Sequence, residues 1–301
     1  LPTDPLVLDA TATPAKVAGL YDVGRDAVRV TGDEPLAANL HTTQILDGQY
    51  HGGTIERALD EDRTLADRVQ RTLDTVGELH DRPLVVGKQS LLGRFDIPDN
   101  AETLHYHAAR GLNRAACDAV VCLGAPHPQV ADLERSARLL AQGETDLRVG
   151  GEEYSTRQGT APPIYRKLLF EDGAGDGRAV PTKGFSGLVG ELWREAREKE
   201  LVQVLHRIRP LLATQTKHAY LLTNVPTSTP VGEVATFEEL ADSLEAMLPA
   251  PEGAIDLLAA VHDVVAGDGP DGFRAEQLVE QRDDGTVANK VDAYHRLAPP
   301  S

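Results

Sequence analysis

The sequence predicts an α/β protein in which helices cover both faces of a parallel sheet. Short apolar runs alternate with helical patterns over the first two thirds of the 301 residues, and runs such as 84–86 and 120–123 are apolar throughout. Unbroken Val/Leu runs are typical of strands buried on both faces. Their alternation with helices is the pattern of a doubly wound fold.

The individual elements follow from these runs. We expect strands at residues 5–10, 27–30, 41–46, 83–87, 118–124 and 218–225. We expect helices at residues 15–21, 64–80, 130–142 and about 185–209. A glycine-rich stretch between residues 165–170 and 178–180 predicts a β-hairpin inserted into this domain.

The end of the chain has a different pattern. Residues 226–233 (PTSTPVGE) predict a turn-rich linker. Helical patterns follow at residues 236–247, 254–265, 274–282 and 286–297, which predict a small all-helical module. The last two could form a helix–turn–helix, or part of a winged helix, with Lys290 and Arg296 exposed on the second helix. DNA contact, packing on the α/β domain and binding of a partner protein all stay open.

The charge balance limits the partners. Asp and Glu number 47 against 30 Lys and Arg, a net charge of −17, and only seven of the basic residues are lysines. This composition fits a halophilic protein and equally an acidic cytosolic one. It argues against a non-specific polyanion binder but allows a local basic site. No apolar run approaches the roughly 20 residues of a membrane span, and no secretory signal is visible. We therefore expect a cytoplasmic protein with no membrane partner.

A first segment suited to phosphate chemistry covers residues 104–128. Its short strand leads to a loop that contains Arg110, Gly111 and Asn113. Ligands of doubly wound sheets bind beyond the carboxyl ends of strands, where we expect this loop to lie. A glycine lets backbone amides approach a phosphate, and the Asn113 amide can hydrogen-bond a ribose or a phosphate.

A second segment, residues 200–214, ends a helix with two arginines. Arg207 and Arg209 precede Pro210, and Gln203 shares a helix face with Arg207 because the two are four residues apart. Guanidinium groups are well suited to bidentate phosphate contacts, although a solvated basic helix end would look the same. The third segment, residues 7–14, is a strand that ends in threonines.

In this order the segments resemble the motifs of superfamily 2 helicases, above all those of plasmid and viral replication helicases and primase–helicases. VLDATATP (7–14) resembles motif III, DRPLVVGKQS (81–90) motif IV, HYHAARGLN (105–113) motif V and QVLHRIRP (203–210) motif VI. The resemblance covers about residues 5–226. It implies two RecA-like motor domains with Mg²⁺-ATP bound in the cleft between them. It also implies that single-stranded nucleic acid, expected to be DNA during replication, binds across the top of both domains.

The resemblance also implies roles for individual residues. Arg207 matches the arginine finger that reaches the γ-phosphate, with Gln203 and Arg209 beside it in motif VI. The motif V turn (Arg110, Gly111 and Asn113) matches a nucleotide contact. The residues matched to nucleic-acid contacts in motifs III and IV are Thr11, Thr13, Lys88, Gln89 and Ser90, to which the C-terminal module would add Lys290 and Arg296.

The sequence departs from the helicase pattern in one major respect. It contains no GxxxxGK[ST] loop and no DExx box after an apolar strand, so the parts that hold Mg²⁺-ATP are missing. Together with Leu1 at the start, this predicts a fragment that has no ATPase activity alone and needs a first motor domain, upstream or in another chain. Residues 1–35 would end that first domain, 36–226 would form the second and 227–301 the C-terminal module. In motif VI, His206 replaces a glycine and Arg209 comes one position early.

Other interpretations stay open. A non-catalytic DNA-binding or assembly module with the same fold would lack a GxxxxGK[ST] loop upstream of Leu1 in its gene. A nucleotide-binding enzyme of other chemistry would need a glycine-rich loop after the first strand, which VLDATATP does not offer. His105 and His107 could ligate a metal but lack a nearby third ligand. Tyr106 and Trp193 could stack bases, but isolated aromatic residues are more often part of the core.

Overall fold

The structure is a computed structural model that describes residues 13–29, 39–61, 63–108, 112–141, 148–149, 152–153, 163–171, 178–185, 187–248, 279–281 and 287–289. The chain divides into two compact units, Leu1–Leu244 and Glu245–Ser301, which are described separately. None of the helices in the described ranges is long and apolar enough to cross a membrane.

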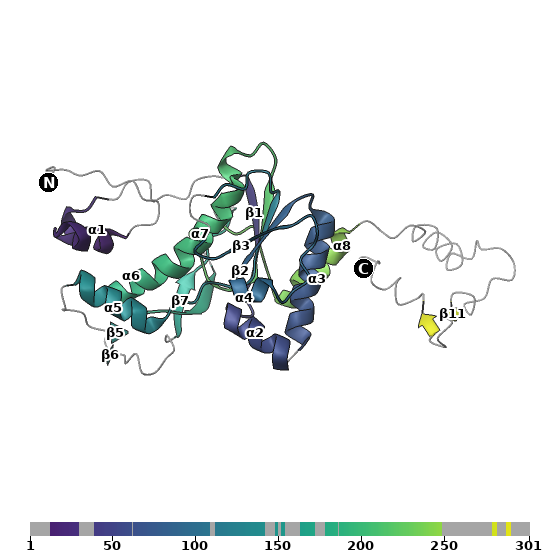
Figure 1. The fold of residues 1–301 in the computed structure, drawn as a ribbon, viewed down its shortest axis with the longest axis horizontal. Coiled ribbons are helices and arrows are strands. Elements are labelled where there is room, and N and C mark those ends of the chain that lie inside the picture. Colours follow the sequence, from purple (N-terminus) through teal and green to yellow (C-terminus); the bar gives the residue numbers. More distant parts are fainter. Residues whose placement is uncertain are drawn as a thin grey trace. The chain divides into compact units, whose positions relative to one another are not determined.

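A six-stranded parallel sheet forms the centre of the first unit (Figure 1). Its strands are β1 (Leu40–Ile45), β2 (Pro83–Gly87), β3 (Glu102–His105), β4 (Ala119–Cys122), β9 (Lys217–Leu221) and β10 (Glu233–Ala235). They lie in the order β10-β1-β9-β4-β2-β3, and every adjacent pair is parallel. All residues of β2 and β4 are buried, as the apolar runs predict. The predicted α/β class with a parallel sheet is confirmed.

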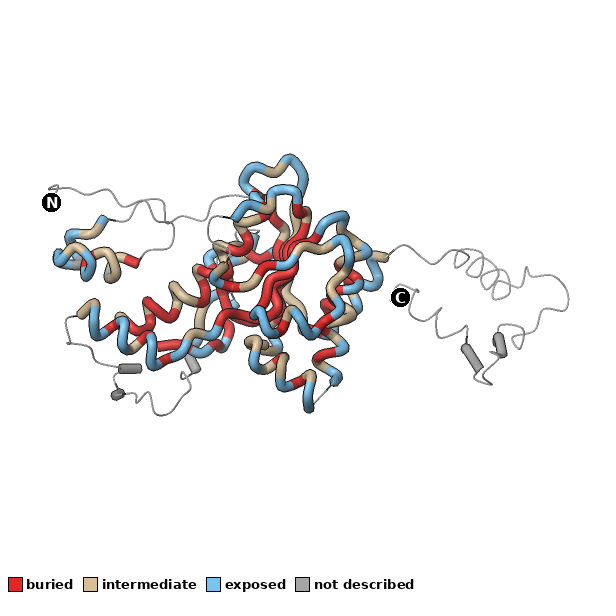
Figure 2. Tube along the Cα trace, in the orientation of Figure 1, coloured by how far each residue is buried: buried red, intermediate tan, exposed pale blue. Residues whose placement is uncertain are grey.

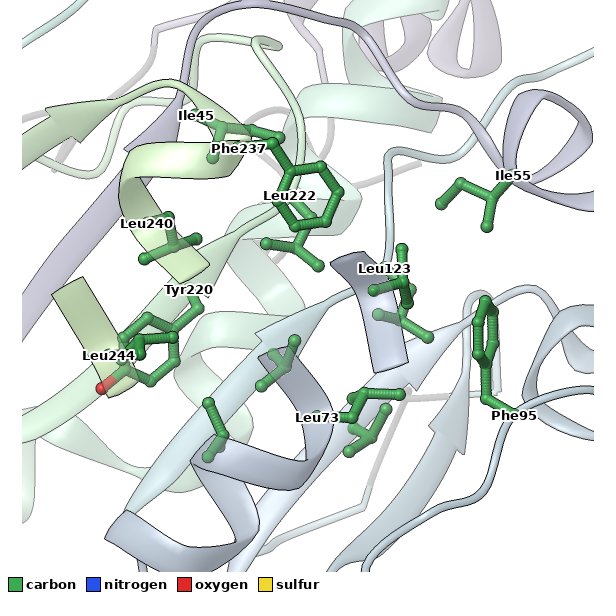
Figure 3. Close-up of a cluster of buried hydrophobic side chains, with 14 of the residues drawn as sticks. Ile45, Ile55, Leu73, Phe95, Leu123, Tyr220, Leu222, Phe237, Leu240 and Leu244 are labelled. Atoms are coloured by element: carbon green, nitrogen blue, oxygen red, sulfur yellow. The ribbon is translucent and has the colours of Figure 1, made fainter. Parts of the chain in front are cut away.

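Helices cover both faces of this sheet (Figure 1). On one face lie α2 (Gly52–Glu61), α3 (Arg63–Leu79), α4 (Gln89–Leu92) and α8 (Phe237–Met247), and on the other lies α7 (Glu200–Leu205). Alternate residues of each strand point to opposite faces. Val85 and Val121 therefore join the first core, which lies between the sheet and α2, α3, α4 and α8, while Val86 and Val120 join the second core, which lies between the sheet and α7. Figure 2 shows the resulting continuous buried layer along the strands, and Figure 3 shows the first core, where Phe237 and Leu240 meet the sheet.

The first unit has further helices and strands besides this three-layer core. They are α1 (Pro14–Tyr21), α5 (Val130–Leu140), β5 (Arg148–Val149), β6 (Glu152–Glu153), β7 (Pro163–Lys167), β8 (Ala179–Lys183) and α6 (Gly187–Arg194). The helix predicted at about 185–209 is broken into α6, a π-helical turn (Glu195–Lys199), α7 and a 3₁₀ turn (His206–Ile208). β7 and β8 pair antiparallel at the predicted β-hairpin, but residues 172–177 between them lie outside the described ranges, so the turn stays a prediction.

The structure corrects the predicted domain boundary at residue 227. β10 extends the sheet beside β1, and Phe237, Leu240 and Leu244 of α8 are buried against it, so both elements belong to the sheet unit. A reciprocal pair of hydrogen bonds between Thr236 and Glu239, a capping box, starts α8. The PTSTPVGE stretch is therefore a loop within the unit, which ends after Leu244. The predicted boundary at residue 35 also falls within this unit.

Three other predicted elements are wrong within the described ranges. Residues 27–30 were expected to form a strand, but Arg25–Ala27 is a 3₁₀ turn in which the Ala27 N–H donates to the carbonyl of Gly24, and neither Val28 nor Arg29 is part of a strand. In the second unit, β11 (Val279–Gln281) and β12 (Val287–Asn289) pair antiparallel within segments predicted as helices. The Asp284-Gly285 pair between two β-branched valines favours a hairpin over a helix. The rest of the predicted helix–turn–helix, including Lys290 and Arg296, lies outside the described ranges.

Because α8 is buried against the sheet, shortening the Phe237 side chain should destabilise the fold. This side chain is fully buried and packs edge-to-face on Tyr50 with ring centroids 5.5 Å apart. Phe237→Ala should lower the free energy of unfolding by about 3–5 kcal/mol, the usual cost of removing a buried phenylalanine. Urea unfolding followed by circular dichroism measures this.

The control is Met247→Ala at the other end of the same helix, where the residue is 62% exposed. It should change stability by less than about 0.5 kcal/mol. Equal effects of the two substitutions would show that α8 does not complete the sheet core.

Candidate functional site

Two segments far apart in the sequence meet at the amino end of the sheet. Lys217, the first residue of β9, donates hydrogen bonds from its ammonium group to the carbonyls of Ala115 (2.6 Å), Cys117 (2.7 Å) and Ile208 (2.6 Å). An ammonium group has three donors, and all three are used here. Lys217 therefore joins the loop before β4 to the end of the helix that contains Arg207.

The predicted residues Arg207, Arg209 and Asn113 lie together at this junction. Arg207 Nη1 donates to the carbonyl of Leu112 (3.2 Å), and the backbone N–H of Arg114 donates to the carbonyl of Arg207 (2.9 Å). Arg209 Nε donates to Asn113 Oδ1 (3.3 Å), which also accepts the backbone N–H of Ala115. The two segments proposed as motifs V and VI are thus in direct contact.

The helix end at Arg209 has an unusual backbone. Arg209 has φ 56° and ψ 50°, in the left-handed region that non-glycine residues seldom adopt. Pro210 follows directly, and a residue before proline is disfavoured in the right-handed helical region. The left-handed turn ends the helix and turns the Arg209 side chain toward Asn113. Strained residues of this kind often occur at functional sites.

α7 and the 3₁₀ turn after it carry two buried polar atoms without hydrogen-bond partners among the described residues. Within the described residues, neither Gln203 Oε1 nor Arg207 Nε has a hydrogen-bond partner, although both atoms are buried. One turn earlier, Glu200 is 3% exposed and accepts the backbone N–H of His107 (2.7 Å). Burial lowers the pKa of Arg207, but a guanidinium keeps its charge in proteins. This segment thus offers a charged donor and an amide acceptor that protein groups do not satisfy.

The loop with Asn113 is not at the carboxyl end of the sheet, where the sequence placed it. β3 and β4 are both parallel to β2, so the chain must return from the carboxyl end of β3 to the amino end of β4. Leu112 and Asn113 lie on the last part of this return, beside Lys217 and the start of β9. Arg110 and Gly111 lie outside the described ranges.

Three of the residues matched to nucleic-acid contacts have partners within the chain that account for their polar groups. Lys88 Nζ pairs with Glu56 at 2.8 Å, and Ser90 Oγ donates to the same carboxylate, while Gln89 begins α4. A phosphate would have to displace Glu56 to reach Lys88 and Ser90. Thr13 is buried as the N-cap of α1, where its hydroxyl accepts the backbone N–H of Lys16, and Thr11 lies outside the described ranges. Capping explains Thr13 without a ligand.

The metal and stacking alternatives gain no support. No group of three or more potential metal ligands was found within the described ranges. Tyr106 is buried with its hydroxyl donating to the carbonyl of Gly124 (2.6 Å), and Trp193 is 1% exposed. Both aromatic rings are core residues, as the simpler interpretation of the sequence expected.

A second polar cluster, which the sequence analysis missed, lies at the carboxyl end of the sheet. The loops after β1 and β4 are in close contact, because a Cβ on Gly124 (φ 71°) would lie 1.8 Å from the carbonyl oxygen of Tyr50. Beside this contact the rings of His51 and His127 lie close together in a tilted arrangement, with centroids 4.7 Å apart and planes inclined by 30°. The only signal in the sequence was glycine and histidine in two loops, which is too weak to identify a site.

The lowered pKa values of five histidines determine the expected dependence of stability on pH. Removal from water is the largest cause that lowers the pKa of His51, His127, His80, His206 and His218. A lowered folded-state pKa means that the unfolded chain binds more protons, so stability is full above an ordinary histidine pKa of about 6.5 and falls as the pH drops below it. The free energy of unfolding should therefore be smaller at about pH 5.5 than at about pH 7.5.

The double variant His51→Gln/His127→Gln removes two of these titrating groups. Its loss of stability between the two pH values should be smaller than that of the wild type, because glutamine does not titrate. Carboxylates with lowered pKa values, such as Asp118 and Glu56, lose their contribution only at more acidic pH. A wild-type stability that does not change over this interval would contradict the assignment.

Comparisons with models of protein families, with curated proteins and with solved structures found no match to this chain. A functional assignment therefore depends on the geometry of the site and on the order of the segments in the sequence.

Proposed function

We propose that this chain is the second motor half of an ATP-dependent helicase or translocase that acts on single-stranded nucleic acid, DNA being the first candidate. Its RecA-like sheet would supply Arg207 to an ATP site completed by a first motor domain. The observation that carries the proposal is the direct hydrogen bonding between residues 112–114 and 207–209. The two segments are about 95 residues apart in the sequence and precede the neighbouring parallel strands β4 and β9, so the sheet brings them side by side, in agreement with the motif match.

The electrostatic setting supports a phosphate ligand. Within the described residues, neither Arg207 nor Arg209 forms an ion pair with a carboxylate, while the neighbouring Arg114 pairs with Glu102 at 2.6 Å. In a chain with a net charge of −17, two guanidinium groups that have no carboxylate partner form a local basic site. The unsatisfied Nε of Arg207 can donate to a phosphate oxygen, and Gln203 Oε1 can accept from a bound water or hydroxyl.

The residues of this chain provide only one side of an ATP site. Mg²⁺-ATP supplies the phosphoryl group that is transferred to water. Arg207 would contact the terminal phosphate and stabilise the negative charge that develops there, while Asn113 holds Arg209 and the loop beside it. A phosphate-binding loop and an acidic metal ligand would come from the first motor domain.

Substitution of Arg207 tests this role in the protein that joins this chain to an ATP-binding half. Arg207→Ala should lower the kcat of nucleic-acid-stimulated ATP hydrolysis at least tens-fold, because arginine fingers contribute about 10³–10⁵ in rate in GTPases. ATP affinity should change only a few-fold, since the contact strengthens in the transition state. Steady-state kinetics and nucleotide binding measure the two effects.

Two further variants locate the active guanidinium. Arg207→Lys should restore little activity, because a point charge cannot reproduce the planar fork. Arg209→Ala should have a smaller effect than Arg207→Ala, because Arg209 is exposed and held by Asn113. A larger loss at Arg209 would show that the motif VI alignment is shifted, and no loss at either arginine would favour a non-catalytic module.

A further inference from the structure

The β7–β8 ribbon has one buried and one exposed face. Paired residues of antiparallel strands point to the same side, and the register pairs Tyr165 with Pro181 and Lys167 with Ala179. On β8 the residues alternate between exposed and buried, with Val180 and Thr182 on the buried side. The buried face packs through Leu168 and Val180 on Val231, next to β10. The other face of the ribbon is open to solvent.

The exposed face combines an aromatic ring with positive charge. Tyr165 is 77% exposed, among the most exposed large apolar side chains within the described ranges. Lys167 and Lys183 lie on the same face, and neither forms an ion pair with a described carboxylate. These are two of only seven lysines in the chain. No acidic residue lies among the described residues of this face, although Asp and Glu outnumber Lys and Arg by 17 in the whole chain.

The ribbon is fixed beside the carboxyl end of the sheet. Asn224, just after β9, donates from Nδ2 to the carbonyl of Pro181 (3.2 Å), and the Trp193 indole N–H donates to the carbonyl of Lys183 (3.2 Å). The Trp193 ring also contacts the ring of His127, with ring centroids 5.3 Å apart, and Lys183 is among the charges that lower the pKa of His51 and His127. The ribbon is therefore linked through Trp193 to the histidine pair at this end of the sheet.

We infer that the exposed face of the β7–β8 ribbon binds single-stranded nucleic acid, with one base stacked on Tyr165 and the backbone phosphates contacted by Lys167 and Lys183. An exposed aromatic ring with flanking cations and no carboxylates is the chemistry of single-strand stacking sites. A protein partner of this acidic chain would be expected to pair with some of its many carboxylates, and the described residues of this face include none. The inference takes only the class of ligand from the proposed function, because Tyr165, Lys167 and Lys183 lie outside all the segments matched to helicase motifs.

Binding of a fluorescein-labelled oligothymidylate, measured by fluorescence anisotropy at low salt without nucleotide, tests the stacking contact. Tyr165→Ala should raise Kd about tenfold, since base–aromatic stacking is worth about 1–3 kcal/mol. Tyr165→Phe keeps the ring and should bind like the wild type. The matched control is Leu139→Ala on α5, which removes a side chain that is 76% exposed and should leave Kd unchanged.

An abasic oligomer of the same length separates stacking from charge. It should bind wild type and Tyr165→Ala equally, because it has no base to stack. The double variant Lys167→Gln/Lys183→Gln should instead flatten the dependence of log Kd on log salt, by up to about 0.7 per lost phosphate contact.

Three results would overturn the inference: no oligothymidylate binding by the wild type at low salt, equal binding by wild type and Tyr165→Ala, or an equal loss with the abasic oligomer. Because no nucleotide is present, the result does not depend on the arginine-finger proposal. A negative result for Tyr165 would not contradict the role of Arg207 in ATP hydrolysis, and a negative result for Arg207 would not contradict stacking on Tyr165.

Discussion

The site at the amino end of the sheet depends on the ammonium group of Lys217. Three backbone carbonyls, from Ala115, Cys117 and Ile208, accept its hydrogen bonds, and burial lowers its pKa. Hydrogen bonds to a charged donor contribute about 1.5–3 kcal/mol, and removal of the donor would leave partly buried carbonyls without partners. Lys217 begins β9, so it holds the loop before β4 and the end of the Arg207 helix against the central strands. The positions of Arg207, Arg209 and Asn113 follow from this constraint.

Charge pairing separates the arginines of this acidic chain into two groups. Nine of them within the described ranges form ion pairs with carboxylates: Arg68, Arg71, Arg82, Arg94, Arg114, Arg135, Arg138, Arg166 and Arg197. Arg207 and Arg209 hydrogen-bond to a carbonyl and an amide oxygen instead, and neither forms an ion pair with a described carboxylate. Lys167 and Lys183 of the β7–β8 ribbon likewise form no ion pair with a carboxylate in the part of the chain that the structure describes. Within the described residues, cations without a carboxylate partner thus occur near both ends of the sheet, at Arg207 and Arg209 beside the start of β9 and on the ribbon that Asn224 joins to the end of β9.

The sequence predicted the parts of the fold that depend on continuous apolar runs. β2 and β4 are buried on both faces, and their Val/Leu runs could form little else. It missed β10, because this edge strand has only three residues and follows a proline-rich loop. It also placed Asn113 at the wrong end of the sheet, since the sequence does not show that β2 separates β3 from β4. Likewise, Lys217 looks like an ordinary polar residue before a strand, and only the fold reveals its three carbonyl partners.

Amide hydrogen exchange in Lys217→Met tests most directly whether the two segments form one site. Methionine keeps the length of the side chain but donates no hydrogen bond. The account predicts faster exchange at Arg114 and Cys117 in one segment and at Arg209 in the other, with β2 and its neighbours in the sheet unchanged. Exchange that accelerates in only one segment, or in neither, would contradict the claim that Lys217 holds the two together.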